Sequence, residues 1–448
     1  MRQLARTMCL TLSLVAAACG TEHAPTPTGP SSLSGQTAAG SAPIVPGPSA
    51  TGSAAAPTPV AAPAALASLA RSSNAFGLAL YGEAIRKPAG NLALSPVSLT
   101  LALTMTWAGA RTDTAKQMQQ VLHLEGSVEA VSKSAGELSA YLQDPARPVT
   151  LRMANRLFGE KTATFEPAFL DLTQAAFGAQ LQPEDFKGSF EPSRSDINRW
   201  VSDRTEQRIK DLLPQGAITA ETALVLVNAI YFLASWDEAF DAKATAPAKF
   251  HLSKTESKDV PTMSHTGQYL TATAKGVTLL ELGYKDPNLS MTIVLPEQVD
   301  GLGAVEKELS ADTLAKWTGA LQAARVHVTL PKFEIDPPKS LALKDPLCAL
   351  GMPLAFDKKK ADFSGLAKLP SKDDHLAISD AFHKAFVKID EKGTEAAGAT
   401  AVVVGGPGGA APAKPREVIV DHPFLFFVRE RASGLVLFMG RVTDPAVH

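Results

Sequence analysis

The segment from Thr394 to Val404 combines the alternation of a strand with the composition of a loop. At the strand period of two, one face carries only small, uncharged side chains: Thr394, Ala396, Gly398, Thr400, Val402 and Val404. The segment runs directly into Gly405 to Gly409, which suits no regular element. Such side chains make a weak edge strand but would not obstruct insertion between two existing strands. The segment therefore predicts a switch between loop and strand; on composition alone, an ordinary Ala/Gly-rich surface loop is the alternative.

Strand patterns flank this segment, Ala377 to Ile389 before it and Glu417 to Val428 after it. Together they resemble the serpin family: Glu391 to Ala399 matches the hinge pattern E-x-G-T-E-A-A-x-A, and Asp421 to Phe427 matches the C-terminal signature. Further matching stretches are Asn91 to Gly109, Ala154 to Phe158, Leu226 to Phe232 with Trp236, and Leu350 to Ser364. The resemblance spans roughly residues 68 to 448 in the family's order, which chance does not explain.

The order of the helix and strand patterns predicts an α+β fold, because helices come early in the folded region and strands late. Ser95 precedes a proline and an apolar run to Trp107, which predicts a buried helix with Ser95 as its N-cap. Thr150 to Phe158 and Ala223 to Phe232 are predicted strands. The second is apolar on both faces except at Asn228, so both faces should be covered.

Asp196 to Leu213 has the apolar spacing of an amphipathic helix. The serpin resemblance implies a large central β-sheet plus two smaller sheets, surrounded by about nine helices. It also implies an exposed reactive-centre loop at about residues 391 to 416.

The first residues have the pattern of a secretory signal, because a basic start is followed by an apolar run too short to span a bilayer. The run ends at Cys19 in a sequence that resembles a bacterial lipobox, and cleavage after an Ala-x-Ala motif is the alternative. Residues 19–67 are rich in Pro, Ala, Gly, Ser and Thr. We therefore expect a signal peptide at 1–18, a disordered tether at 19–67 and a serpin domain at 68–448. The protein should be extracellular, lipid-anchored through Cys19 to the bacterial cell envelope or exposed at the outer surface.

Charge and cysteine content limit the partners. A formal net charge of -2 gives no argument for nucleic acid or for an acidic membrane surface, so a membrane would be reached only through a lipid on Cys19. Of three cysteines, only Cys348 lies in the folded region, so an intrachain disulfide framework is not possible there. Cys348 is interpreted as a small hydrophobic side chain. We expect a monomer that needs no cofactor and no metal.

An enzyme must also be considered, because Ser95 or Ser98, His383, and Asp380 or Asp390 include the residue types of a hydrolase triad. Both serines open a buried helix, where substrate would be excluded. No G-x-S-x-G elbow, H-E-x-x-H motif or phosphate-binding loop accompanies them. The sequence therefore argues against a hydrolase and predicts no catalytic residue.

The serpin resemblance gives these polar residues another role. It implies that Ser95, Ser98, Asn228 and His383 form a hydrogen-bonded cluster beneath the main sheet, the shutter, where strands part to admit the loop. Trp236 matches the tryptophan of the breach, near the top of the same opening. Isolated polar residues in the core, with no shared function, are the alternative.

The resemblance implies a serine-type endopeptidase inhibitor that acts as a suicide substrate. The protease serine would attack the loop to give an acyl-enzyme, and the freed hinge would then insert into the main sheet and trap the protease. The hinge residues would be Glu391, Gly393, Thr394, Glu395, Ala396, Ala397, Gly398 and Ala399. Thr394 would be the first inserted side chain to face the core.

Counting from both ends of the loop bounds the cleaved bond. Counting forward by the usual hinge length places the residue before the bond at Pro407, and counting back from Glu417 and Pro423 places it at Pro412. The loop is therefore about five residues longer than usual. Because this departure could delay insertion, a noninhibitory serpin that acts as a binding or structural module remains an alternative, as does an inhibitor of a cysteine protease.

Ala410 and Ala411 are the best candidates for the scissile bond, because proline on either side of a bond makes a poor protease substrate. They suit an extracellular serine protease with a small specificity pocket, elastase-like or subtilisin-like. Lys414 and Arg416 keep a trypsin-like target as an alternative. The uncharged inserting face of the hinge favours an inhibitor over the noninhibitory alternative.

Overall fold

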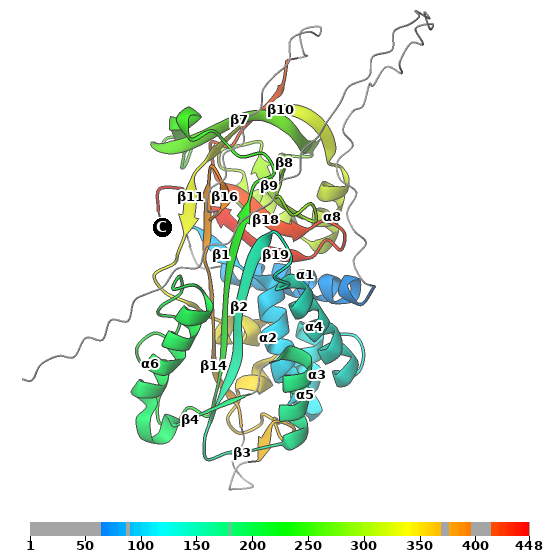
Figure 1. Ribbon diagram of the computed structural model, residues 1–448, viewed down its shortest axis with the longest axis vertical. Helices are drawn as coiled ribbons and strands as arrows, with labels where there is room; N and C mark the ends of the chain where they lie inside the picture. The colour runs from blue at the N-terminus through cyan, green and yellow to red at the C-terminus, as the bar shows by residue number, and fades with distance from the viewer. Residues whose placement is uncertain (1–63, 87–89, 179–180, 369–375, 396–413, 448) are drawn as a thin grey trace, which may run out of the picture. The chain divides into compact units, whose positions relative to one another are not determined.

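Two long strands, β2 (Val149–Glu160) and β5 (Leu224–Ser235), run side by side and pair antiparallel (Figure 1). They belong to a computed structural model that describes residues 64–86, 90–178, 181–368, 376–395 and 414–447. These residues lie within one compact unit that begins at Ala55. The predicted signal peptide, Cys19 and most of the predicted tether lie outside the described residues.

Nine α-helices occur in the described residues: α1 (Ala64–Ala84), α2 (Pro96–Ala108), α3 (Thr112–Val121), α4 (Val128–Leu142), α5 (Pro167–Phe177), α6 (Phe186–Arg204), α7 (Leu302–Glu308), α8 (Ala311–Gly319) and α9 (Lys344–Leu350). Two short 3-10 helices, η1 (Ala242–Ala244) and η2 (Pro353–Phe356), accompany them. Helix α1 begins four residues before the predicted domain boundary at residue 68. None of the described helices is both long and apolar enough to cross a membrane.

The described strands form three sheets. The nine-stranded sheet has the order β1 (Leu92–Leu94), β19 (Val436–Val442), β18 (Phe424–Glu430), β9 (Leu289–Pro296), β8 (Val277–Gly283), β7 (Ser257–Ala274), β10 (Gln322–Pro331) and β17 (Arg416–Ile419), with β6 (Ala246–His251) beside β7. The eight-stranded sheet has the order β11 (Phe333–Ile335), β15 (Val387–Asp390), β16 (Gly393–Thr394), β5, β14 (Ile378–Ala385) and β12 (Leu341–Ala342), with β2 beside β5 and β4 (Gln182–Glu184) beside β2. The third sheet pairs β13 (Ala367–Lys368) with β3 (Thr164–Phe165). Three sheets and nine described helices confirm the expected α+β architecture.

Strand β5 is covered on both faces, as its apolar sequence around Asn228 predicts. Its even-numbered residues, among them Leu226 and Ile230, lie in the core that contains α2. Its odd-numbered residues, among them Val227 and Tyr231, pack with apolar residues of α6. The alternation of a strand thus places two helix layers on opposite faces of the same sheet.

Helix α2 is buried along its whole length, which confirms the prediction from its apolar sequence. Ser95 is its N-cap, and the Ser95 side chain accepts a hydrogen bond from the Ser98 backbone N–H at 3.4 Å. Pro96 occupies the first turn, where a missing N–H costs nothing. The cap places both serines directly under the eight-stranded sheet.

The helix predicted at Asp196 to Leu213 differs from α6, which begins ten residues earlier and ends at Arg204. The chain stops being helical because Glu206 and Gln207 adopt positive φ angles of 51° and 62°. Ile209 is nevertheless fully buried, beside the apolar face of α6. The apolar residues after Arg204 therefore keep a helix-like spacing although their segment is irregular, because they pack in the same core as α6.

The single strand predicted at Glu417 to Val428 is instead two strands, β17 and β18, in different parts of the nine-stranded sheet. The break falls before Pro423, which has no N–H to contribute to a ladder. Strand β17 pairs parallel with β10, whereas β18 pairs antiparallel with β9 and β19.

Candidate functional site

Two residues of the predicted hinge lie within the eight-stranded sheet. Strand β16 comprises Gly393 and Thr394 and pairs antiparallel with β15 on one side and with β5 on the other. Beyond it, β14 pairs directly and in parallel with β5. The boundary between β5 and the β14–β15 segment is therefore opened by two hinge residues at one end and closed by β14 from Leu224 to Ile230.

Thr394 faces the core and is 1% exposed. Its hydroxyl lies 2.7 Å from the hydroxyl of Tyr284, whose ring stacks on Trp236 with 4.6 Å between centroids. Burial raises the pKa of Tyr284, so this phenol stays protonated and able to share a hydrogen bond with Thr394. A neutral polar contact thus holds the first inserted side chain.

Trp236 ties the sheet to the turn that precedes the hinge. Its indole N–H donates to the Asp390 carbonyl at 3.0 Å, and its backbone N–H donates to the Lys392 carbonyl at 2.9 Å. Trp236 itself is 1% exposed. The structure therefore brings the predicted breach residue into contact with the chain entering the hinge.

Gly393 is required by close backbone packing. Its φ is +151°, and a Cβ at this position would lie 2.0 Å from the carbonyl oxygen of Ala234. Any larger residue would push β16 away from β5. The hinge pattern has glycine here because the inserted strand passes directly against the backbone of its neighbour.

Glu391 anchors the other end of the turn. Its carboxylate accepts hydrogen bonds from Lys332 Nζ at 2.8 Å and from the Thr245 hydroxyl at 2.7 Å. Burial opposes ionisation of Glu391, but the bonds from Lys332 and Thr245 outweigh it and hold the pKa of this carboxyl below its ordinary value. The ionised Glu391 side chain thus fixes the start of the hinge to Lys332 and Thr245.

Glu395 marks the point where the described hinge ends. Its backbone φ is +49°, and its side chain is 9% exposed against the guanidinium of Arg208. Burial raises the pKa of Glu395, while the charge of Arg208 opposes that rise. Ala396, Ala397, Gly398, Ala399, Ala410 and Ala411 lie outside the described residues.

A row of polar side chains crosses three strands below the hinge. Asn155 in β2 and His383 in β14 lie opposite Asn228 of β5 in the strand register. The Asn228 amide donates to Asn155 Oδ1 at 2.6 Å and to Ser98 Oγ at 2.7 Å. His383 Nδ1 lies 2.5 Å from Asn228 Oδ1, and the Ser95 backbone N–H donates to His383 Nε2 at 3.1 Å. The structure thus brings together all four predicted shutter residues.

The hydrogen bonds determine the tautomer of His383. Because Nε2 accepts from Ser95, the ring proton must sit on Nδ1 and be donated to Asn228. Burial lowers the pKa of His383 to about 3, so the ring is neutral at physiological pH. Asn228 and His383 thereby satisfy each other's hydrogen-bonding groups across the boundary between β5 and β14.

No hydrolase triad forms in the described part of the chain. The Ser95 hydroxyl donates to the Leu437 carbonyl at 2.7 Å, and Ser95 meets His383 only through its backbone N–H. The carboxylates of Asp380 and Asp390 accept bonds from nearby backbone N–H groups. The polar row is therefore structural rather than nucleophilic.

Sequence reasoning missed several residues of this region, among them Asn155, Tyr284 and Arg208. Asn155 could have been found, because it interrupts the apolar series Leu151, Met153 and Leu157 on one face of β2. Tyr284 and Arg208 follow a strand end and a helix end, where polar residues are common. Their contacts with the hinge become visible only in the fold.

Comparisons with known proteins agree with this geometry. A family profile described as serpin (serine protease inhibitor) matches residues 71–445. Leukocyte elastase inhibitor of Bos taurus is 40% identical over 366 residues, which cover 80% of this chain and 94% of that protein. The structure of Serpin48 from the insect Tenebrio molitor has a TM-score of 0.74 at 31% identity, covering 84% of this chain and 98% of the other. Human thyroxine-binding globulin has a TM-score of 0.76 at 28% identity, covering 86% and 100%.

The two-residue hinge strand, the polar row and these likenesses define one class of protein. The chain belongs to the serpin family of serine protease inhibitors. The family description and the relatives' names are those of protease inhibitors, not of enzymes.

Proposed function

We propose that the chain inhibits extracellular serine proteases as a suicide substrate, by inserting its cleaved loop between β5 and β14. The observation that carries this proposal is β16, because two hinge residues already pair with strands on both sides. Continued insertion after Thr394 would follow the direction that β16 has begun. The acyl-enzyme would then be carried along with the inserting strand.

Strand directions explain why insertion would release energy. Strands β5 and β14 now share one parallel ladder, whereas β16 is antiparallel to both of its neighbours. A longer inserted strand would replace one parallel ladder with two antiparallel ladders, and antiparallel pairing is slightly more stable per residue. The gain in backbone hydrogen bonds is the driving force that the trap requires.

We infer an elastase-like or subtilisin-like target. Ala410 and Ala411 offer the small side chains that a narrow specificity pocket accepts. The similarity to a leukocyte elastase inhibitor supports the same choice. The protein would act as a monomer.

We further propose that the protein is secreted and tethered to a bacterial cell envelope through a lipid on Cys19. The support is the sequence alone: the apolar run ending at Cys19, and the Pro/Ala-rich residues after it. Mass spectrometry of the mature protein would test this, because acylation adds the mass of the lipid to Cys19. A mature protein cleaved after another residue and free of lipid would contradict the anchor.

The inhibitor function is tested by incubating the purified protein with an elastase and with a subtilisin, then running denaturing gels. We expect a covalent adduct that survives denaturant. Clean cleavage of the loop without any adduct would instead support the noninhibitory alternative. A cysteine protease run in parallel tests the other alternative.

Two variants of Thr394 link the adduct to insertion. T394R places a charged, bulky side chain where the native one is 1% exposed, so it should be cleaved without forming an adduct. T394V keeps the size of the side chain and loses only the bond to Tyr284, so it should still form the adduct. An adduct from T394R as abundant as that of the native protein would contradict insertion at β16.

A further inference from the structure

Ile419, the last residue of β17, is an apolar side chain at the protein surface. It is 49% exposed, and Phe190 and Val447 are the other large hydrophobic side chains exposed in the described part of the chain. Val418 and Val420 on either side of it are each 2% exposed, so strand alternation turns them to the core and Ile419 to the outer face of the sheet. One exposed hydrophobic residue is ordinary, so its surroundings decide what it means.

The strand register surrounds Ile419 with polar side chains. Thr329 of β10 lies opposite Ile419, and Ser264 of β7 lies opposite Thr329. Together with the next row of the same face they form what we call the β17 face: Ser264, Thr266, His327, Thr329, Glu417 and Ile419. An apolar centre with a polar rim is the arrangement found in protein–protein contact surfaces.

Hydrogen bonds and an ion pair hold the polar rim in place. The Thr266 hydroxyl lies 2.8 Å from His327 Nδ1, which links β7 to β10 across the face. Glu417 pairs with the exposed Lys414 at 3.8 Å, so its charge is partly balanced within the chain. The rim is therefore preformed, and the apolar surface of Ile419 is the part that a partner would cover.

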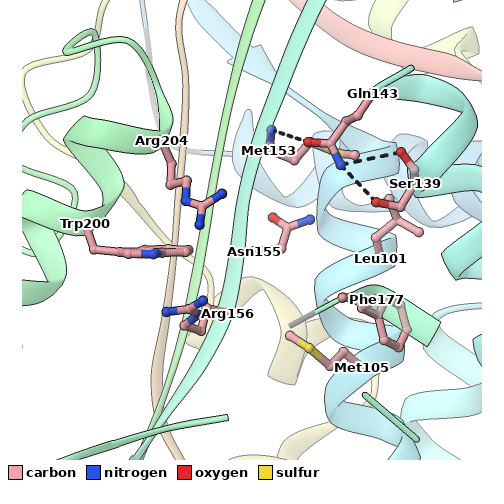
Figure 2. A pocket seen from close by; sticks show the side chains of 11 residues that line it. Leu101, Met105, Ser139, Gln143, Met153, Asn155, Arg156, Phe177, Trp200 and Arg204 are labelled. Atoms are coloured by element: carbon pink, nitrogen blue, oxygen red, sulfur yellow. Dashed lines mark hydrogen bonds between the residues drawn. The ribbon is translucent and has the colours of Figure 1, made fainter. Parts of the chain in front are cut away.

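Strand β17 also ends its sheet. It pairs with β10 and with no further strand in the residues that the structure describes. The edge of β2 in the other sheet is covered instead. There the Met153 backbone N–H donates to the Gln143 side chain at 3.2 Å, and Gln143 donates to the Ser139 hydroxyl at 3.1 Å (Figure 2). The β17 face thus adjoins a strand edge that another protein can approach.

The β17 face follows the reactive loop directly in the chain. Five residues lead from Ala411, at the predicted scissile bond, to Arg416 at the start of β17. Five residues span at most about 17 Å. A protease domain of about 240 residues has a radius of gyration of about 18 Å, so it extends roughly 20 Å to either side of its active site. An enzyme that holds the loop in its cleft therefore lies over the β17 face.

We propose that the β17 face is a second contact surface for the target protease, in which Ile419 packs against an apolar patch beside the active-site cleft. The patch lies on the side of the cleft that binds residues after the scissile bond, because β17 follows that bond in the sequence. This inference rests on the proposed function, since it takes the loop to be offered to a protease. The contact would select among enzymes that share a small specificity pocket.

The rate constant at which elastase and subtilisin consume the intact chain tests the contact. Consumption includes both the covalent adduct and the cleaved chain. A native chain that is cleaved without any adduct would therefore contradict the proposed function, while its consumption rate would still measure the contact.

Two substitutions of Ile419 change the contact to different degrees. I419T keeps a β-branched side chain that suits a strand and removes apolar surface, so consumption by at least one of the two enzymes should slow by about fivefold. I419K places a charge in the contact and should slow the same enzyme by about tenfold or more. I419T keeps the test valid if I419K folds poorly.

Val447 provides the matched control, because it is 51% exposed and lies near the other end of the same sheet. The Val447 carbonyl accepts a hydrogen bond from Asn91, directly before β1, whereas β17 is the last strand in the sheet order. V447T and V447K should leave the consumption rate unchanged. The ratio of the I419T rate to the native rate should be the same at low and at high salt, because an apolar contact is not screened.

Three results would overturn the proposal. The first is an unchanged consumption rate of I419T and I419K with both enzymes, and the second is an equal slowing in V447K. The third is a native dimer in gel filtration that I419K converts to a monomer, because the β17 face would then bind a second copy of the chain.

Discussion

Asn228 of β5 and His383 of β14 face each other across a parallel strand pair, with 2.5 Å between Asn228 Oδ1 and His383 Nδ1. This bond crosses the boundary that an inserting strand must open. Both side chains are buried, at 0% and 1% exposure, so separating them without new partners would be costly. Ser95 and Ser98 lie beneath them and share in the same network.

Acid should destabilise the native protein through His383. The pKa of its ring is about 3 in the native state and about 6.5 when unfolded. Between these values the unfolded state binds more protons, so stability falls as the pH is lowered below about 6.5. From this group alone we expect a loss of about 2 kcal/mol at pH 5, visible as a lower urea midpoint.

Variants of two histidines separate this effect from general acid sensitivity. H383Q keeps a donor and an acceptor but does not titrate, so the part of the pH dependence that is due to His383 should disappear. H123N changes an exposed histidine and should keep the native pH dependence. If H383Q and the native protein lose the same stability between pH 7 and pH 5, the ring is not the source.

Asn155 should matter for stability although it lies on β2, one strand away from the boundary. N155L would leave one amide hydrogen of Asn228 and the hydroxyl of Ser98 without their partner. We expect a cost of about 1 to 3 kcal/mol in urea unfolding. R152L, on the same strand, changes a half-exposed surface ion pair and should cost less than about 0.5 kcal/mol. Equal stability of N155L and the native protein would show that the row is not coupled through this residue.

The sequence predicts those elements of the fold whose burial requires a recognisable apolar pattern. Helix α2 and strand β5 have mainly apolar sequences because α2 is covered on all sides and β5 on both faces. Ser95 is recognisable as a cap because the helix chemistry is local. Strands β6 to β8 were not predicted, because β6 and much of β7 have exposed polar residues and no clear alternation.

The contacts of the candidate site depend on tertiary register, which a single sequence does not contain. His383 and Asn228 are 155 residues apart, and only the parallel pairing of β14 with β5 places them together. The extent to which the hinge enters the sheet also depends on three-dimensional packing. Insertion of Gly393 and Thr394 relies on the approach to Ala234 and on Tyr284, neither of which the hinge pattern names.

Arg208 should help to hold the hinge in its present position. It neutralises the buried carboxylate of Glu395, and R208Q would leave that carboxylate with only the Tyr231 hydroxyl and the charge of Lys388 to stabilise it. Because Arg208 is about half exposed, we expect R208Q to lower the free energy of local opening at β16 by only about 1 kcal/mol. This corresponds to a few-fold faster hydrogen exchange at the Thr394 amide.

A double-mutant cycle checks this assignment. E395Q removes the charge that Arg208 neutralises, so R208Q combined with E395Q should exchange more slowly at Thr394 than R208Q alone. R199Q is the control for the loss of one positive charge. Effects of R208Q and E395Q that simply add would show that the ion pair does not restrain the hinge.

Cleavage of the loop should raise the melting temperature of the protein. If insertion adds about ten backbone hydrogen bonds at ~1 kcal/mol each, and 1 kcal/mol shifts Tm by about 2 °C, the rise is on the order of 20 °C. Calorimetry of the native protein before and after nicking with a protease that has then been removed measures this. T394R, nicked in the same way, should show little rise, because its hinge is blocked at the first buried position. An unchanged Tm in the nicked native protein would mean that the sheet holds no energy in reserve, and the trap would then lack a driving force.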